Sequence, residues 1–370
     1  MTAVSARTRH VFKTLPLLMF AGLAIVLLQS ADASATAVRQ REFSYENVTL
    51  TEDTVWRGRV TVRGSLVVAA NATLRIEAGT TIRFGKTPIL DQLPNLVVMG
   101  RLHCSGTKSN PVVFSSMSDQ SWGGIVMLAT EKKNLMEHFR IEGALKAVEA
   151  RFSHLTMRHG LIQRGVHGIV ASDAVLHASH VQLNVADRGV QATGSEFEFR
   201  HGSIKGGRHG IEAFDSTLDI YYGTISSCLV SGITAKDCRV RVRNTVISDC
   251  VAGAMFHGGE GQLLLSQFRQ NRDAALYLKS ARLKVSRSMF FASRRDAVTV
   301  EDGNAVFYGN VFEGNQGYNL VNKGAEDVLA IQNWWGSNSE PAIKSRIQDN
   351  KNGQVGIAPW LPQKPAALPF

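Results

Sequence analysis

The chain has 370 residues, of which 44% are hydrophobic and 19% are charged, so it is globular and long enough to bury a substantial core. Its formal net charge of +10 favours acidic partners, such as uronic-acid polysaccharides, anionic envelope glycans or lipid headgroups. The four cysteines lack the CxxC spacing of common zinc sites, which argues against that class of metal site.

The N-terminus predicts export. Three basic residues precede the apolar run Leu15–Leu28, which has the length of a signal-peptide core and is short for a membrane span. The sequence "ADASATA" that follows satisfies the small-residue cleavage rule. We therefore expect residues 1–35 to be a signal peptide, with an uncleaved anchor as the alternative, and the protein to be periplasmic, exposed on the cell surface or secreted.

The next residues predict β-strands. Residues 55–85 consist almost entirely of strand and turn patterns, and residues 96–116 and 121–128 continue in the same style. Residues 129–146 are charged and lack a clear periodicity. We expect a longer loop there that leaves the sheet, where folds of this type place binding elements.

From about Ala150 the sequence repeats every 21 or 22 residues, with the alternation typical of short strands. One apolar column comprises Ile162, Leu183, Ile204, Ile225, Ile247, Phe268, Phe290 and Phe312, and a second comprises Leu276, Val298 and Leu320, with Leu278 and Val300 two residues further on. Recurring glycines argue against a helical repeat: Gly168, Gly189, Gly210, Gly232 and Gly253. Three short strands per repeat predict an all-β parallel β-helix over residues 36–338, in which equivalent residues stack on successive coils.

A turn position of the repeat is small or polar throughout, as in Gly165, Ala186, Gly207, Cys228, Cys250, Asn271, Ser293 and Asn315. This register places Cys228 and Cys250 on adjacent coils, within the usual Cα distance of a disulfide. A pair of reduced, buried thiols is the other interpretation. Cys104 and Cys238 have no partner in the pattern.

Basic residues recur at the same interval in two columns: His159, His180 and His201, and His167, Arg188 and His209. By strand parity both columns point outward on consecutive coils. Arg164 lies nearby, as do three further arginines that we count as candidate binding residues: Arg158, Arg200 and Arg208. Three hypotheses remain open. The columns are copied surface residues without a function, a strip that binds a linear polyanion, or a metal site in which two imidazoles tilt onto one ion.

The C-terminal residues 339–370 predict a cap and a proline-rich tail. Ser339, Glu340 and Pro341 are typical of a helix start, with a capping residue and an early proline. A short helix there would cover the last coil, whose strand edges would otherwise be unpaired. We expect Trp334 and Trp335 to form the apolar surface on which this helix packs.

Several segments resemble the bacterial secreted right-handed β-helix repeat proteins of the pectate-lyase-like superfamily: "ATLRIEAGTTIRF", "LVVMGRLHCSGTKSNPVVFSS" followed by "SWGGIVM", and the late "NWWG" and "APWL". The resemblance covers residues 45–362 and implies a right-handed coil. The superfamily includes polysaccharide lyases, glycoside hydrolases, uronate epimerases, tail-spike adhesins and periplasmic proteins that help mature copper enzymes. The paired aspartates of its hydrolases, the Asp-Pro-His-Asp run of its epimerases and the clustered calcium ligands of its pectate lyases do not occur in this sequence.

We therefore expect an exported, non-catalytic binding or scaffold protein that contacts anionic polysaccharide or another envelope component as a monomer. No cofactor is indicated, Ca²⁺ and other divalent metals included. We expect no nucleic-acid partner, and membrane contact only through an uncleaved N-terminal segment. The first alternative is a polysaccharide lyase that acts on uronate polymers through His159, Arg188 and His209. The second is a periplasmic accessory protein for metal-enzyme maturation.

Overall fold

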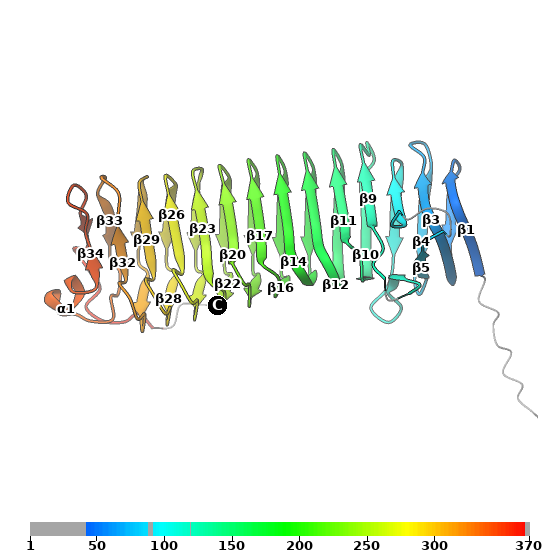
Figure 1. Ribbon diagram of the computed structural model, residues 1–370. Helices are drawn as coiled ribbons and strands as arrows, with labels where there is room; N and C mark the ends of the chain where they lie inside the picture. Colours follow the sequence, from blue (N-terminus) through cyan, green and yellow to red (C-terminus); the bar gives the residue numbers. More distant parts are fainter. Residues whose placement is uncertain (1–41, 88–91, 119, 367–370) are drawn as a thin grey trace, which may run out of the picture. The chain divides into compact units, whose positions relative to one another are not determined.

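Each strand pairs in parallel with the equivalent strand of the next coil, and the resulting sheet winds into a β-helix. The computed structural model describes residues 42–87, 92–118 and 120–366, which belong to one unit, Gln40–Phe370. The expected signal peptide lies outside these residues. Figure 1 shows the coils side by side, from β1 (Glu42–Leu50) to the short helix α1 (Glu340–Lys344). Within the described ranges, no helix is long and apolar enough to cross a membrane.

Each coil has three faces. Face 1 contains β2 (Thr54–Trp56), β4 (Thr73–Glu77), β7 (Arg101–Ser105), β13 (Val175–Ser179), β15 (Glu196–Arg200), β18 (Thr217–Tyr221), β21 (Arg239–Arg243), β24 (Glu260–Leu264), β27 (Arg282–Ser286), β30 (Ala305–Tyr308), β33 (Val328–Ile331) and β35 (Val355–Gly356). Face 2 contains β5 (Thr81–Gly85), β8 (Val112–Ser116), β16 (Ser203–Lys205), β19 (Thr224–Ser226), β22 (Val246–Ser248), β25 (Gln267–Arg269), β28 (Met289–Phe291) and β31 (Val311–Glu313). Face 3 contains β6 (Asn95–Val98), β9 (Gly124–Leu128), β11 (Lys146–Arg151), β17 (His209–Phe214), β20 (Ser231–Lys236), β23 (Ala252–His257), β26 (Leu276–Lys279), β29 (Val298–Glu301), β32 (Leu320–Asn322) and β34 (Ile347–Gln348).

Five longer strands turn a corner and belong to more than one face. β1, β3 (Arg59–Val68) and β14 (Gln182–Thr193) run over faces 2 and 3, and β10 (Asn134–Glu142) runs over faces 1 and 2. β12 (His154–Ser172) runs over all three. The predicted all-β parallel β-helix is therefore confirmed.

The core is filled by the two apolar columns predicted from the repeat. The first column runs in register from Ile162 to Phe312, and all its members are buried. Leu276, Val298 and Leu320 are likewise register partners. The phenylalanine rings at the end of the first column stack at 5.1 and 5.0 Å between centroids. Such offset aromatic pairs add to the energy of apolar burial.

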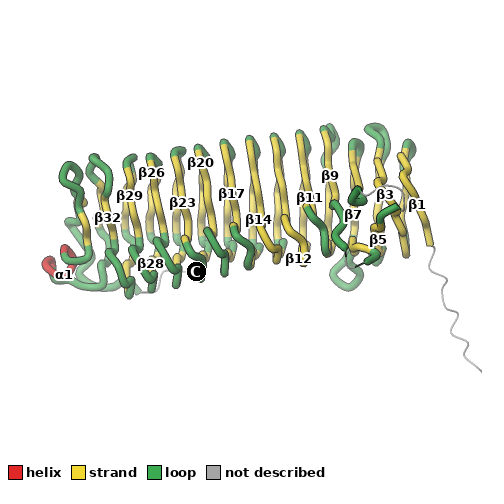
Figure 2. The backbone as a smooth tube through the Cα atoms, in the orientation of Figure 1, coloured by secondary structure: helices red, strands yellow, loops and turns green. Residues whose placement is uncertain are grey.

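The turns line up from coil to coil (Figure 2). The recurring glycines lie where one coil touches the next, because a Cβ at Gly210 would come within 2.4 Å of the carbonyl oxygen of Gly232. The same contact recurs between Gly189 and Gly210, at 2.6 Å. Only glycine allows the backbones to approach this closely.

The structure overturns the loop expected over residues 129–146. Half of that segment is β10, which pairs with β7, β8 and β12 inside the coil stack. Met136 and Phe139 are both buried although they are three residues apart, because His138 between them has a left-handed φ of 45°. This corner interrupts the alternation of apolar and polar residues, so the sequence pattern did not reveal the strand.

Cys228 and Cys250 lie at neighbouring positions in one buried turn column, but no disulfide joins them, and all four cysteines are free. A hydrogen bond with Cys250, together with burial, raises the pKa of Cys228. Further along the column, the amide N–H of Cys250 donates to Asn271 Oδ1 at 3.1 Å. The column therefore satisfies turn backbone groups inside the core.

The last coil is closed by α1, as predicted. Pro341 lies in its first turn, and Ile343 is fully buried in the core. Ser339 is at the N-cap position, but its side chain makes no capping hydrogen bond, contrary to the expectation. Trp335 is buried and stacks on Phe312 at 4.5 Å, whereas Trp334 is half-buried.

Candidate functional site

The three predicted histidines, with one further ring at each end, form a continuous stack that we call the histidine ladder: His138, His159, His180, His201 and Tyr222. Successive ring centroids are 4.5, 4.8, 5.1 and 4.8 Å apart, and the rings are tilted by 25° or less. The ladder lies at the corner between faces 1 and 2. His138 is half-buried and the other four side chains are exposed, so ring edges are accessible on five successive coils.

Backbone geometry accounts for part of this pattern. All five ladder residues have φ between 45° and 55°, a left-handed conformation in which histidine is enriched among non-glycine residues. The same corner is occupied further along the chain by Asn244, Leu265 and Arg287. The turn therefore permits histidine but does not require it, and four successive histidines need another explanation.

A groove lies beside the N-terminal part of the ladder. Its volume is about 540 Å³, and it is lined by Thr107, Lys108, Pro111, His138, Phe139, Arg140, His159, Gly160, Leu161, His180 and Gln182. One wall is the loop 106–111, which inserts six residues where only His138 separates the matching strand positions of the next coil. None of the described lining residues is acidic, so the groove presents imidazoles, an amine and a guanidinium.

The three arginines predicted beside the histidines have different environments. Arg158 forms an ion pair with Glu137 at 3.0 Å. Arg200 pairs with Glu198 at 2.8 Å and lies 4.5 Å from the centre of the Tyr221 ring. Arg208 lies at the opposite corner of the coil, between faces 2 and 3. Two of the three cations are therefore locally neutralised.

The second predicted column is a separate ladder. His167, Arg188 and His209 are register partners at the start of face 3, so face 2 separates them from the histidine ladder. Arg188 forms ion pairs with Asp187 at 2.6 Å and Glu212 at 2.5 Å. This ladder is therefore not a free basic strip, because two carboxylates that the sequence analysis did not consider balance its charge.

Burial perturbs both histidines of this second ladder. It is the main cause that lowers the pKa of His167 and of His209, against the opposing effect of Asp187 and Glu212 respectively. His209 Nδ1 lies 3.0 Å from Ser231 Oγ, but Ser231 is fully buried and cannot meet a polymer. The arrangement can hold neutral imidazoles near pH 7, yet it offers no unpaired cation for a substrate carboxylate.

The structure gives no support to a metal site. Among the residues that it describes, no group of three or more His, Cys, Asp or Glu side chains is placed to hold one ion. The ladder rings are nearly parallel, so neighbouring nitrogens point in similar directions instead of converging. Partial burial, followed by the imidazoles of His138 and His180, lowers the pKa of His159.

Two family models match the chain. The pectate-lyase like beta helix domain matches residues 43–149, and the right handed beta helix region matches residues 188–334. The chain is a right-handed parallel β-helix repeat protein. No curated protein matches this β-helix protein in sequence.

Solved structures with similar folds have low identity to the β-helix protein. A double mutant of the periplasmic alginate epimerase AlgG is 11% identical and has a TM-score of 0.49, with 84% of this chain and 78% of that chain covered. The A-module of the Azotobacter vinelandii mannuronan C-5 epimerase AlgE6 is 12% identical, with a TM-score of 0.45 and coverage of 84% and 91%. An alginate lyase from Paenibacillus is 14% identical, with a TM-score of 0.30 and coverage of 82% and 99%. Similarity at this level does not tell what the β-helix protein binds.

Sequence reasoning missed several residues of the β-helix protein's candidate site. His138 and Tyr222 could have been predicted from the sequence, because each lies 21 residues, or one repeat, beyond an end of the predicted histidine column. Lys108 and Arg140 carry no such signal. They approach the ladder because the loop 106–111 and β10 take positions that only the coil register reveals.

Proposed function

We propose that the protein binds an anionic, uronate-containing polysaccharide in the groove along the histidine ladder. The observation that carries the proposal is the ladder itself, five stacked rings on consecutive coils. Its first three rings line a groove together with Lys108 and Arg140, and none of the described lining residues is acidic. Protonated imidazoles and these two cations would meet carboxylates, and the flat ring edges would contact the sugar rings of an extended chain.

Polygalacturonate binding, measured by isothermal titration calorimetry, tests the proposal. His159→Ala/His180→Ala should weaken binding by about tenfold, since tenfold corresponds to only 1.4 kcal/mol of lost contacts. Binding should also strengthen as the pH falls, because bound carboxylates favour the protonated imidazoles. Because the pKa of His159 is lowered, this histidine becomes protonated, and strengthens binding, at a lower pH than an ordinary histidine.

The matched control is His154→Ala/His177→Ala, which removes two exposed histidines of face 1 from the same coils. It should bind polygalacturonate like the wild type. Poly-L-glutamate tests whether the site selects a saccharide or any polyanion. Equal affinities for the ladder variant and the control variant, or a wild type that binds no uronate polymer, would contradict the proposal.

A polysaccharide lyase is the second candidate, and the lowered pKa values of His167 and His209 favour it, because a general base must be neutral at working pH. Against it stands Arg188, which is held by two carboxylates instead of facing an open groove. Ultraviolet absorbance of unsaturated ends in the same incubations decides the matter. An increase that His209→Ala abolishes would establish the lyase. Export of the chain also remains a prediction.

A further inference from the structure

Face 1 contains a second hollow, which is centred on β24. On this strand the inward position between Val240 and Leu283 is occupied by Gly261. A Cβ at Gly261 would lie 2.0 Å from the carbonyl oxygen of Val240, so no other residue fits that backbone path. The depression over this strand has a volume of about 680 Å³, with Val240 and Leu283 in its lining.

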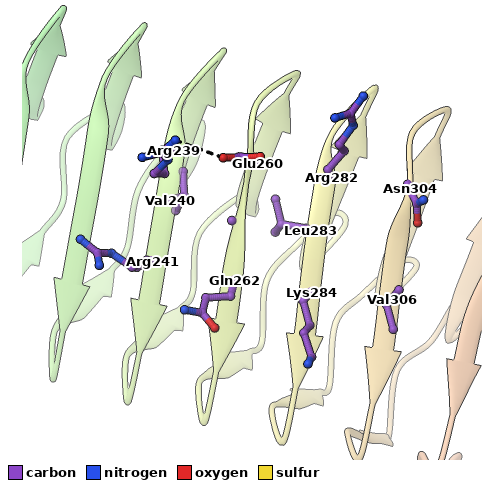
Figure 3. Close-up of a pocket in the computed structure, with 11 residues that line it drawn as sticks. Arg239, Val240, Arg241, Glu260, Gln262, Arg282, Leu283, Lys284, Asn304 and Val306 are labelled. Carbon is purple, nitrogen blue, oxygen red and sulfur yellow. Dashed lines mark ion pairs between the residues drawn. The ribbon is translucent and has the colours of Figure 1, made fainter.

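Four cations flank this hollow. Figure 3 shows that Arg239 and Arg241 come from β21 and that Arg282 and Lys284 come from β27, on either side of β24. Arg239 pairs with Glu260 at 3.3 Å, the single carboxylate among the described lining residues. Arg241 is held by Asp219 of the preceding coil at 2.5 Å.

Arg282 and Lys284 differ from the other two cations, because neither makes an ion pair or a side-chain hydrogen bond within the described part of the chain. Two exposed cations without partners therefore flank a depression with an apolar floor, and this surface can accept an anion. A uronate residue matches it, with a carboxylate for the cations and a sugar ring for the apolar floor.

The groove and the hollow lie on the two sides of the corner that carries the ladder: the groove on face 2, through Arg140, Leu161 and Gln182, and the hollow on face 1. Tyr222 ends the ladder, and on the next coil the exposed Arg243 occupies the last outward position of β21, beside the same corner. From His138 to the coil of β27 there are seven coil-to-coil steps, which at roughly 4.8 Å each span about 34 Å. A chain that follows this corner avoids Glu196 and Glu198, which lie on face 1 before the hollow.

We infer that the hollow at Gly261 is a second uronate site and that one linear polymer occupies it together with the ladder groove. The inference rests on the proposed function and extends it, because it sets the length and the linearity of the ligand. A polymer that spans both sites makes its second contact intramolecularly and gains affinity over a short oligomer. A trisaccharide is too short to span them and fills each site separately.

The experiment compares polygalacturonate with trigalacturonate on wild type and Arg282→Ala/Lys284→Ala. In the variant, polygalacturonate should bind at least about tenfold more weakly, because the gain from the second site is lost. The number of trigalacturonate molecules bound per chain should fall from two to one. Arg269→Ala/Arg272→Ala, which removes the same charge from exposed positions outside face 1, should behave like the wild type. Thermal melting by circular dichroism shows that all three proteins are folded.

The outcomes separate the two proposals. If Arg282→Ala/Lys284→Ala matches the wild type with both ligands while His159→Ala/His180→Ala loses affinity, the second site is wrong and the proposed function stands. If the wild type binds neither ligand, the proposed function fails and the second site fails with it. Weaker polygalacturonate binding in both variants, with one trigalacturonate left in each, establishes both sites.

Discussion

Single atoms decide where the coils of this protein meet. The stacked glycines of face 3 allow each backbone to lie against the next, and the space that a methyl group would need is already filled by a carbonyl oxygen. Gly223, at another corner of the neighbouring coil, is different, because a Cβ there would meet side-chain carbons no closer than 3.4 Å. We therefore expect an alanine substitution to be tolerated at Gly223 and not at Gly210.

Gly210→Ala should lower the free energy of unfolding by about 2 kcal/mol or more, because the coils must separate to admit the methyl group. Gly223→Ala should change it by less than about 1 kcal/mol, since ordinary contacts and lower unfolded-state entropy offset each other. Urea unfolding followed by circular dichroism measures both. Similar losses in the two variants would show that close backbone approach is not the reason for the glycine column.

The second ladder predicts how stability depends on pH. Burial lowers the pKa of His167 and His209 below the ordinary value of 6.5, so the folded protein binds fewer protons than the unfolded chain just below that pH. The contribution to stability is complete above about pH 6.5 and is lost as the pH falls through the lowered pKa values. The charged groups that act on the pair are Asp187 and Glu212, which oppose the effect of burial, and Arg188, Lys146 and Arg208, which add to it.

The free energy of unfolding should therefore decrease from about pH 7.5 to about pH 5, and His167→Gln/His209→Gln should reduce that decrease. Urea unfolding at several pH values measures the slope. A double variant with the same slope as the wild type would assign the pH dependence to other groups.

Spacing alone located much of the candidate site at this scale. The interval of 21 residues identified His159, His180 and His201 as a stack, and the ring distances confirm it. The same interval could not show that Asp187 and Glu212 neutralise Arg188, because ion pairs depend on side-chain reach across coils and not on a repeat. Gly261 does not indicate the hollow from the sequence alone, because the register that places β24 between β21 and β27 must be known first.

Among the elements, β10 and α1 show what a sequence pattern can and cannot define. The helix was predictable because proline and an acidic first turn are local signals. β10 was not, because a left-handed corner inside it puts one interval of three residues, from Met136 to Phe139, into the two-residue alternation of inward positions. Register with the neighbouring coils, which is a non-local property, restores the assignment.

The helix also makes a testable contribution to the last coils. Ile343→Ala should lower the free energy of unfolding by about 2 to 4 kcal/mol, because it removes a fully buried side chain from the end of the core. Hydrogen exchange should accelerate in β32 and β33, which are near that end.

Lys344→Ala is the control, since its side chain is exposed and only pairs with Glu340 at 2.8 Å. It should cost less than about 0.5 kcal/mol and leave exchange unchanged. Uniform acceleration along the whole stack in Ile343→Ala would show that the helix stabilises the protein globally and does not act as a local cap.

The whole molecule is a stack in which each coil contacts only its neighbours, and function in such a protein depends on what successive coils present in line. The fold was predictable from one repeat length because that length sets every pairing. The ligand was not, since a repeat says nothing about loops such as 106–111 or about which cations lack partners. Both proposed sites arise where the regular pattern is interrupted, by an inserted loop in one case and by a glycine in the other.

The insertion at 106–111 has a wider consequence. Its six residues stand opposite the single corner residue His138, yet the strands before and after it remain paired without a shift. Hydrogen bonding to the adjacent layer, and not the count of intervening amino acids, restores the path of the chain after each corner. Recognition segments can therefore be lengthened, shortened or exchanged at any corner while the scaffold beneath them is preserved.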